Sequence, residues 1–193
     1  MADTLTPVHP LRAWADAFAG LPDGLRISAE PLTAAADLRL DPSTPVAADV
    51  ADLLGAAVPT TPNTWVATTR GRIVWLGPDE WLVRSDDHTP HELAELLRGV
   101  GAAAVDVSAQ RTELRLGGPL VRELLALGCS LDLHPSAFPP GSCAQTTVGQ
   151  VGVVLLATDD AFHVLVRPSF AGHLADWLLD ATVEFTPEPG RVS

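Results

Sequence analysis

The 193-residue chain contains no lysine and no tyrosine, and it has only two cysteines and one methionine. Without lysine it can form neither a Schiff base nor the phosphate contact of a P-loop, and without tyrosine it lacks a phenolic acid. No apolar run approaches the roughly 18 residues of a membrane-spanning helix, and the start MADTLTPVHPLRAW lacks the pattern of a secretory signal. We therefore expect a cytoplasmic protein with reduced thiols and no membrane contact.

Positive charge is also scarce, since twelve basic residues, all arginine, stand against 24 acidic ones and give a net charge of -12. Binding to nucleic acids and anionic membranes depends on basic side chains that neutralise phosphates, so we do not expect a nucleic-acid partner. The composition is 47% hydrophobic and 19% charged, which is typical of a globular protein. A chain of this length can bury a substantial core as one compact domain.

Recognisable catalytic and cofactor motifs are missing as well. The sequence has no G-x-G-x-x-G, no P-loop and no G-x-S-x-G element, so we predict neither catalytic residues nor a dinucleotide cradle on this chain. Cys129, His134 and Cys143 together suggest a metal site. However, thirteen residues separate the cysteines and no fourth ligand follows, so we predict buried reduced thiols without a metal.

The hydrophobic pattern repeats along the chain. In the first copy we expect a strand at 37–40, a helix from Pro45 to Gly55, a hairpin of 73–76 with 81–84, a helix after a Thr89–Glu92 capping box and a closing strand at 103–107. In the second copy we expect a strand at 113–116, a helix between Gly118 and Gly128, a hairpin of 153–156 with 162–167, a helix carrying Leu174 and Leu178, and a closing strand at 182–185.

This order, β-α-β-β-α-β twice, predicts an α+β protein of two tandem ferredoxin-like units with antiparallel sheets. We place an N-terminal helical arm at 1–24, the first split βαβ unit at 25–108, the second at 109–187 and a tail at 188–193. The helix of the arm is expected near residues 11–19.

Two features could form a surface for a partner protein. Trp75 and Trp81 lie six residues apart around a tight turn, so they can form a cross-strand pair that belongs either to the core or to an interface. Phe138, Pro139 and Pro140 lie in a rigid proline-rich loop that would lose little entropy on docking. We take all five as candidate interface residues.

Several blocks of the sequence resemble the gamma subunit of heterotetrameric sarcosine oxidase. They are GCSLDLHPSAFPPGSCAQT from Gly128 to Thr146, WLGPDEWLV from Trp75, Asp106-Val-Ser108, LRLGGPLVRELLAL before Gly128, and VLVRPSFAGHLADWLLDA. The resemblance implies a complex that oxidatively demethylates sarcosine to glycine with hydrogen peroxide and passes the methyl carbon to tetrahydrofolate. It also implies that FAD, FMN and NAD belong to the partner subunits. These partners are the alpha, beta and delta subunits, so the complex is an oxidoreductase acting on CH-NH donors and this chain itself is not catalytic.

That family is similar in fold to the first part of the aminomethyltransferase of the glycine cleavage system, which implies a first alternative function. A free-standing folate-binding protein would need Asp106 or Asp132 in a pocket and Arg111 or Arg115 near the glutamate tail of folate. By resemblance Asp132 falls on the catalytic aspartate of those enzymes, but Leu131 replaces the neighbouring asparagine. A stand-alone binding module is the second alternative.

Overall fold

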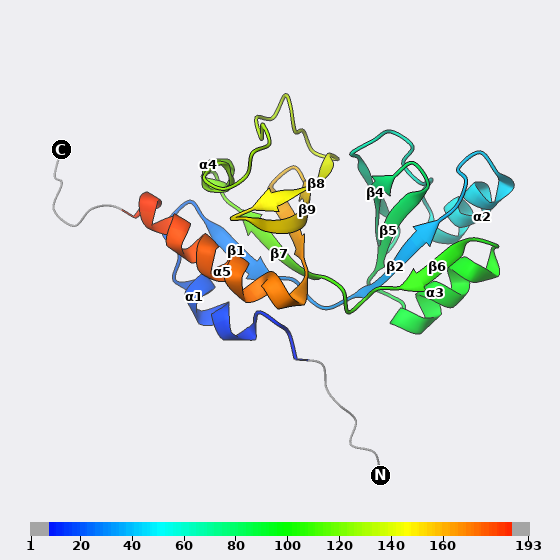
Figure 1. Ribbon diagram of the computed structural model, residues 1–193, viewed down its shortest axis with the longest axis horizontal. Coiled ribbons are helices and arrows are strands. Elements are labelled where there is room, and N and C mark those ends of the chain that lie inside the picture. The colour runs from blue at the N-terminus through cyan, green and yellow to red at the C-terminus, as the bar shows by residue number, and fades with distance from the viewer. Residues whose placement is uncertain (1–7, 187–193) are drawn as a thin grey trace, which may run out of the picture.

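The computed structural model describes residues 8–186, so the predicted tail at 188–193 and the first seven residues of the predicted arm lie outside the described residues. The elements in chain order are η1 (Arg12–Trp14), α1 (Ala15–Ala19), β1 (Arg26–Ala29), β2 (Ala34–Arg39), α2 (Pro45–Leu54), β3 (Trp65–Thr68), β4 (Gly71–Gly77), β5 (Glu80–Ser85), α3 (Pro90–Gly99), β6 (Ala103–Asp106), β7 (Thr112–Gly117), α4 (Val121–Ala126), β8 (Cys143–Val148), β9 (Val151–Ala157), β10 (Ala161–Val166), α5 (Pro168–Thr182) and η2 (Val183–Phe185). Figure 1 shows them as two units that lie side by side, with helices on the outer sides.

The strands form two five-stranded sheets with the orders β3-β4-β5-β2-β6 and β8-β9-β10-β7-β1. Every pairing between these strands is antiparallel. Strands β2 and β7 hold the same place in their sheets, and so do β4 and β9. The α+β class and the internal repeat expected from the sequence are therefore confirmed.

The predicted closing strand at 182–185 is wrong. Thr182 ends α5 and residues 183–185 form the short helix η2, in which Val183 is exposed. Strand β1 takes the edge position instead and pairs with β7, with Ile27 opposite Leu116. It has the alternating burial of an edge strand, since Ile27 is buried and its neighbours are exposed. The second sheet is thus completed by a strand from the start of the chain.

Strands β3 and β8 are elements that the sequence interpretation missed. Each extends its sheet at the edge, next to β4 and β9 respectively. The β8–β9 turn is a two-residue hairpin loop in which Gly149 and Gln150 both have positive φ, as a type I′ turn requires. Glutamine is uncommon in this conformation, so the turn carried no strong sequence signal.

Local sequence signals explain the helix ends. Pro45 opens α2, and Gly55 closes it in the left-handed conformation with φ 74°. The predicted Thr89–Glu92 capping box is present at the start of α3. Helix α4 is shorter than predicted and ends at Ala126, so Gly128 does not cap it. The backbone of Gly128 lies instead against the indole of Trp177, where an added Cβ would come within 2.3 Å of a ring carbon.

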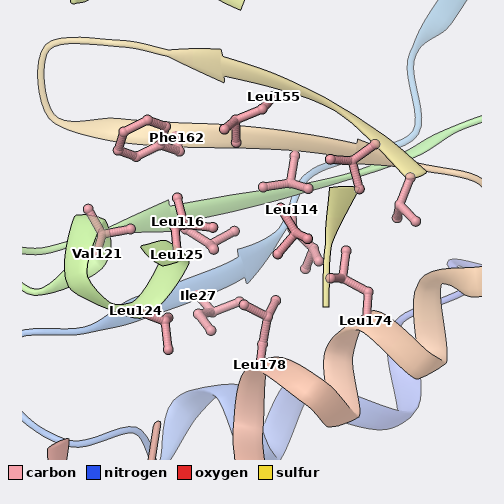
Figure 2. Close-up of a cluster of buried hydrophobic side chains, with 14 of the residues drawn as sticks. Ile27, Leu114, Leu116, Val121, Leu124, Leu125, Leu155, Phe162, Leu174 and Leu178 are labelled. Carbon is pink, nitrogen blue, oxygen red and sulfur yellow. The ribbon is translucent and has the colours of Figure 1, made fainter. Parts of the chain in front are cut away.

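Helices cover the outer face of each sheet. Leu93 and Leu97 of α3 pack with Ile73 and Trp81 of the first sheet. In the second unit Leu174 and Leu178 of α5 point toward the strands that carry Ile27, Leu114 and Leu116, as Figure 2 shows. Burial of these leucines stabilises the fold by about 1.5–3 kcal/mol each.

The inner faces of the two sheets meet in a third apolar cluster, here called the seam. Its buried members are Ala35, Val74, Leu82, Cys143, Val154, Leu156 and Leu165. These residues alternate along the strands with those that face the helices, for example Val74 between Ile73 and Trp75. The molecule is therefore a four-layer arrangement in which both sheets are covered on both faces.

Candidate functional site

The two aspartates proposed for a folate pocket lie in different units of the fold. Asp132 lies in the exposed loop after α4, where its carboxylate accepts the backbone N–H of His134 at 2.9 Å. Asp106 ends β6 in the other sheet and accepts the backbone N–H and the hydroxyl of Ser108 at 2.9 and 2.7 Å. These hydrogen bonds from Ser108 lower the pKa of Asp106. Each carboxylate therefore stabilises the turn of its own loop.

The two candidate arginines also have different surroundings. Arg115 lies on β7 and forms an ion pair with Asp160 at the surface. Arg111 lies in the linker between β6 and β7 and lines a cavity of about 390 Å³. Burial lowers the pKa of Arg111, and the nearby charge of Arg167 adds to this effect. Arg111 thus lines this cavity, whereas Arg115 lines a different one of about 380 Å³.

A buried charge cluster that the sequence interpretation missed crosses the seam. Glu113 of β7 is only 2% exposed, and Arg72 of β4 approaches its Oε1 atom at 3.0 Å. Arg84 of β5 pairs with the Oε2 atom and also donates from its guanidinium to Thr33 Oγ1 at 2.6 Å. His163 Nδ1 of β10 contacts the Oε1 atom. The cluster therefore joins two arginines of the first sheet to a carboxylate and an imidazole of the second.

The surroundings of this cluster determine the protonation states of His163 and Arg84 at pH 7. Burial, and secondly the positive charge of Arg72, lower the pKa of His163 to about 4. The imidazole is therefore neutral at pH 7 and can donate from Nδ1 to Glu113. Burial followed by the charge of Arg72 lowers the pKa of Arg84 to about 10, which leaves it protonated at pH 7. Both oxygens of Glu113 are engaged by charged partners, so the carboxylate cannot act as a free base.

Polar residues on strands gave the signal that could have revealed the cluster. Arg72 and Arg84 are directly opposite each other in the β4–β5 hairpin, and Glu113 stands between the buried residues Thr112 and Leu114 of β7. A charged residue within a strand of an otherwise apolar sheet usually has a buried partner. The sequence does not say which carboxylate pairs with which arginine, because the partners lie on different sheets.

Two of the five candidate interface residues are buried within this chain. Trp81 is 0% exposed and donates its indole N–H to the Pro59 carbonyl at 2.8 Å. Phe138 is 7% exposed and stacks on Phe162 with the ring centroids 6.3 Å apart. Both belong to cores within this chain and offer no free face to a partner.

The remaining interface candidates keep some exposed surface. Trp75 is opposite Trp81 in the β4–β5 hairpin, as expected for a cross-strand pair, and is only partly buried. Pro139 and Pro140 are exposed. Their loop also ties the two units together, because the Trp65 backbone N–H donates to the Gly141 carbonyl at 2.9 Å. These three residues remain candidates for a partner contact.

The cysteines occupy different places. Cys143 is buried in the seam, where its thiol donates to the carbonyls of Thr64 and Trp75 at 3.3 and 3.5 Å. Burial raises the pKa of the Cys143 thiol to about 11. Cys129 is buried in the core of the second unit. Within residues 8–186, no group of three or more histidine, cysteine or acidic side chains is arranged to hold a metal ion.

Among the described helices, none has the length and apolar character needed to cross a membrane. Together, the two five-stranded antiparallel sheets, each covered by helices on its outer face, define an α+β protein of two similar units. The fold is similar to the glycine cleavage system aminomethyltransferase T from Bartonella henselae, with a TM-score of 0.63, 11% identity and coverage of 86% of this chain and 48% of that one. At this identity the likeness describes the fold alone.

The sequence places the chain more narrowly. Residues 39–184 match the sarcosine oxidase, gamma subunit family, and the chain belongs to that family. It is 35% identical to the sarcosine oxidase subunit gamma of Corynebacterium sp. (strain P-1), over 74% of this chain and 72% of the relative. It is 34% identical to the subunit gamma from Arthrobacter sp, over 72% and 70%.

A solved structure agrees with this assignment. The chain superposes on one chain of the heterotetrameric sarcosine oxidase from Corynebacterium sp. U-96, in complex with pyrrole 2-carboxylate, with a TM-score of 0.86. The superposition covers 95% of this chain and 98% of that one at 27% identity. The resemblance inferred from the sequence blocks is therefore confirmed at the level of the family.

Proposed function

We propose that this chain is the accessory gamma subunit of a heterotetrameric sarcosine oxidase complex and that it has no catalytic role of its own. The observation that carries this proposal is the superposition with one chain of such a complex, which covers 98% of that chain. The superposition also covers 95% of this chain, so the described fold is shared almost throughout. The partners would be the alpha, beta and delta subunits of the complex.

The redox chemistry would then belong to the partners. The complex oxidatively demethylates sarcosine to glycine with formation of hydrogen peroxide, and the methyl carbon passes to tetrahydrofolate. FAD, FMN and NAD would bind the other subunits, because this sequence offers neither a G-x-G-x-x-G turn nor a lysine for their phosphates. In this proposal the fold supplies a rigid partner surface.

The state of the acidic side chains supports a non-catalytic role. Asp106 and Asp132 are exposed and hydrogen-bonded within their own turns. Glu113 is buried but engaged by Arg72 and Arg84. A general base needs a free carboxylate within reach of a substrate proton, and none of these three meets that condition.

Spectroscopy and folate titration of the isolated chain test this assignment. We expect the purified chain to be colourless, to lack sarcosine-dependent peroxide formation and to give no saturable heat on titration with tetrahydrofolate. Stoichiometric flavin absorbance on this chain alone would contradict the proposal. Saturable folate binding that is lost in both Asp132→Asn and Arg111→Gln would favour the aminomethyltransferase-like alternative instead.

A further inference from the structure

The cavity beside Arg111 lies where the two linkers between the units run together. The Glu30 backbone N–H donates to the Glu113 carbonyl at 2.9 Å, which joins the linker before β2 to the start of β7. In Figure 1 both linkers pass between the two units on the side opposite the loop between α4 and β8. The cavity measures about 390 Å³. Its apolar wall is formed by Val8, Pro10, Leu32, Pro90 and Pro168.

Part of this wall is exposed although it is apolar. Val8 is 65% exposed and Leu32 is 46% exposed. Both are among the few large hydrophobic side chains that the described residues leave open to solvent, and they line the same cavity. Exposed apolar side chains gathered around one concavity are typical of a binding surface.

The hydroxyl groups of the cavity are already engaged within the chain. Thr33 Oγ1 accepts from the Arg84 guanidinium at 2.6 Å. Ser108 Oγ accepts from the Ala35 backbone N–H at 2.8 Å, and Thr112 Oγ1 is 3.1 Å from His9 Nε2. These three side chains therefore close the cavity wall and do not select a ligand.

Arg111 is different, because it forms no hydrogen bond or ion pair with any residue between 8 and 186. The chain carries 24 acidic residues, yet none of the described ones approaches Arg111 within salt-bridge distance. Arg167 adds a second positive charge nearby, and the N-terminus of α5 at Pro168 opens onto the same cavity without an acidic residue in its first turn. A half-buried guanidinium, an apolar wall and a local excess of positive charge thus occur at one place on a strongly acidic chain.

We infer that this cavity receives an apolar segment of a partner subunit that carries one aspartate or glutamate side chain, and that Arg111 binds its carboxylate. The inference rests on the proposed function, since it names the surface through which the chain joins its complex. A guanidinium can bind a carboxylate through two parallel hydrogen bonds, and the flanking apolar residues of the segment would cover Val8 and Leu32. The opposite charges of segment and cavity would set the register of docking.

Assembly measured with Arg111 variants tests the inference. The chain is co-expressed with the other subunits of its complex, and the affinity for the reconstituted partners is measured by titration. Arg111→Gln should weaken assembly at least about tenfold, because it leaves a partner carboxylate without its cation. Arg111→Lys should weaken it less, since lysine keeps the charge but loses the two-pronged geometry. Leu32→Glu should also weaken it, because it places a negative charge beside the incoming carboxylate.

Matched controls come from surfaces away from the cavity. Arg26→Gln removes another arginine that has no ion pair among the described residues, and Val105→Glu places the same new charge on the exposed strand β6. Both should assemble like the wild-type chain. Circular dichroism of each variant shows whether it is folded. If Arg111→Gln does not fold, the assembly of Leu32→Glu tests the inference in its place.

Each outcome is decisive. If the wild-type chain assembles and the Arg111 and Leu32 variants assemble equally well, the inference is overturned while the proposed function stands. If the wild-type chain does not assemble, both fall. Residues 1–7, outside the described part of the chain, contain one acidic residue, Asp3. If Asp3→Asn and Arg111→Gln each destabilise the isolated chain by the same amount, and the double variant by no more than either, the carboxylate that binds Arg111 comes from this chain itself and the partner segment is excluded.

Discussion

Replacement of Glu113 by glutamine tests how the two units are held together. Glutamine has nearly the same shape, so the change removes the negative charge and leaves the packing in place. Arg84, whose side chain is 8% exposed, and Arg72, at 21%, would then carry positive charges in the seam without an anion between them. Removal of one partner from a buried ion pair costs about 3–5 kcal/mol in the free energy of unfolding. We expect a loss of about 3 kcal/mol for Glu113→Gln, because Arg72 retains some contact with water.

Chemical denaturation followed by tryptophan fluorescence measures this loss. Asp160→Asn is the matched control, since it removes the carboxylate partner of Arg115 at a site where the two side chains are 72% and 32% exposed. That surface pair should contribute little to stability, because water screens the two exposed charges. A loss below about 1 kcal/mol for Glu113→Gln, equal to that of the control, would refute the view that the charge cluster stabilises the seam.

Two further predictions concern pH dependence and helix capping. The pKa of His163 is about 4 in the folded chain and near 6.5 when unfolded, so the unfolded chain binds more protons between these values. Stability should therefore be complete above pH 6.5 and fall as the pH drops toward 4, by at most about 1.4 kcal/mol per pH unit from this group. His163→Asn should make the free energy of unfolding, measured by denaturation at several pH values, depend less on pH. An unchanged pH dependence would show that His163 is not the group responsible. Thr89→Ala should cost about 1 kcal/mol because Thr89 caps α3 through Glu92. Thr44→Ala should cost less in the same assay, since Thr44 makes no side-chain capping bond, and equal losses would show that the capping bond contributes nothing.

Local signals carried most of the fold. Pro45 and Gly55 marked the ends of α2 through proline geometry and the left-handed conformation of glycine, and the Thr89–Glu92 box marked the start of α3. These devices act within one turn of helix, so they can be read from neighbouring residues. The repeat followed from the order of apolar patterns, which predicts a strand, a helix, a hairpin and a second helix in each half.

Long-range pairing could not be predicted in this way. Residues 182–185 have the composition of a short strand, but β1 already occupies the edge of β7 through its buried Ile27. Which of two short segments pairs with an edge depends on the tertiary path of the chain. For the same reason the sequence does not predict the strand that begins at Cys143, although it pairs with β9 and the Cys143 thiol donates to the Thr64 carbonyl across the seam.

The candidate site shows the same limit. Phe138 and Trp81 were recognisable as important aromatic residues, but their burial against Phe162 and beneath the Pro59 carbonyl depends on distant segments. Arg111 was singled out for a folate tail on resemblance. The structure places it on the wall of a cavity between the linkers, which Asp132 does not line.

Native mass spectrometry of the complex captured through a tag on this chain, from cells that express all the subunits, tests the assignment most directly. We expect one mass that corresponds to a single copy of this chain, three partner subunits and bound flavin. The same preparation should form hydrogen peroxide when sarcosine is added. Recovery of this chain alone, or of partners that carry no flavin, would contradict its role as a subunit of a sarcosine oxidase.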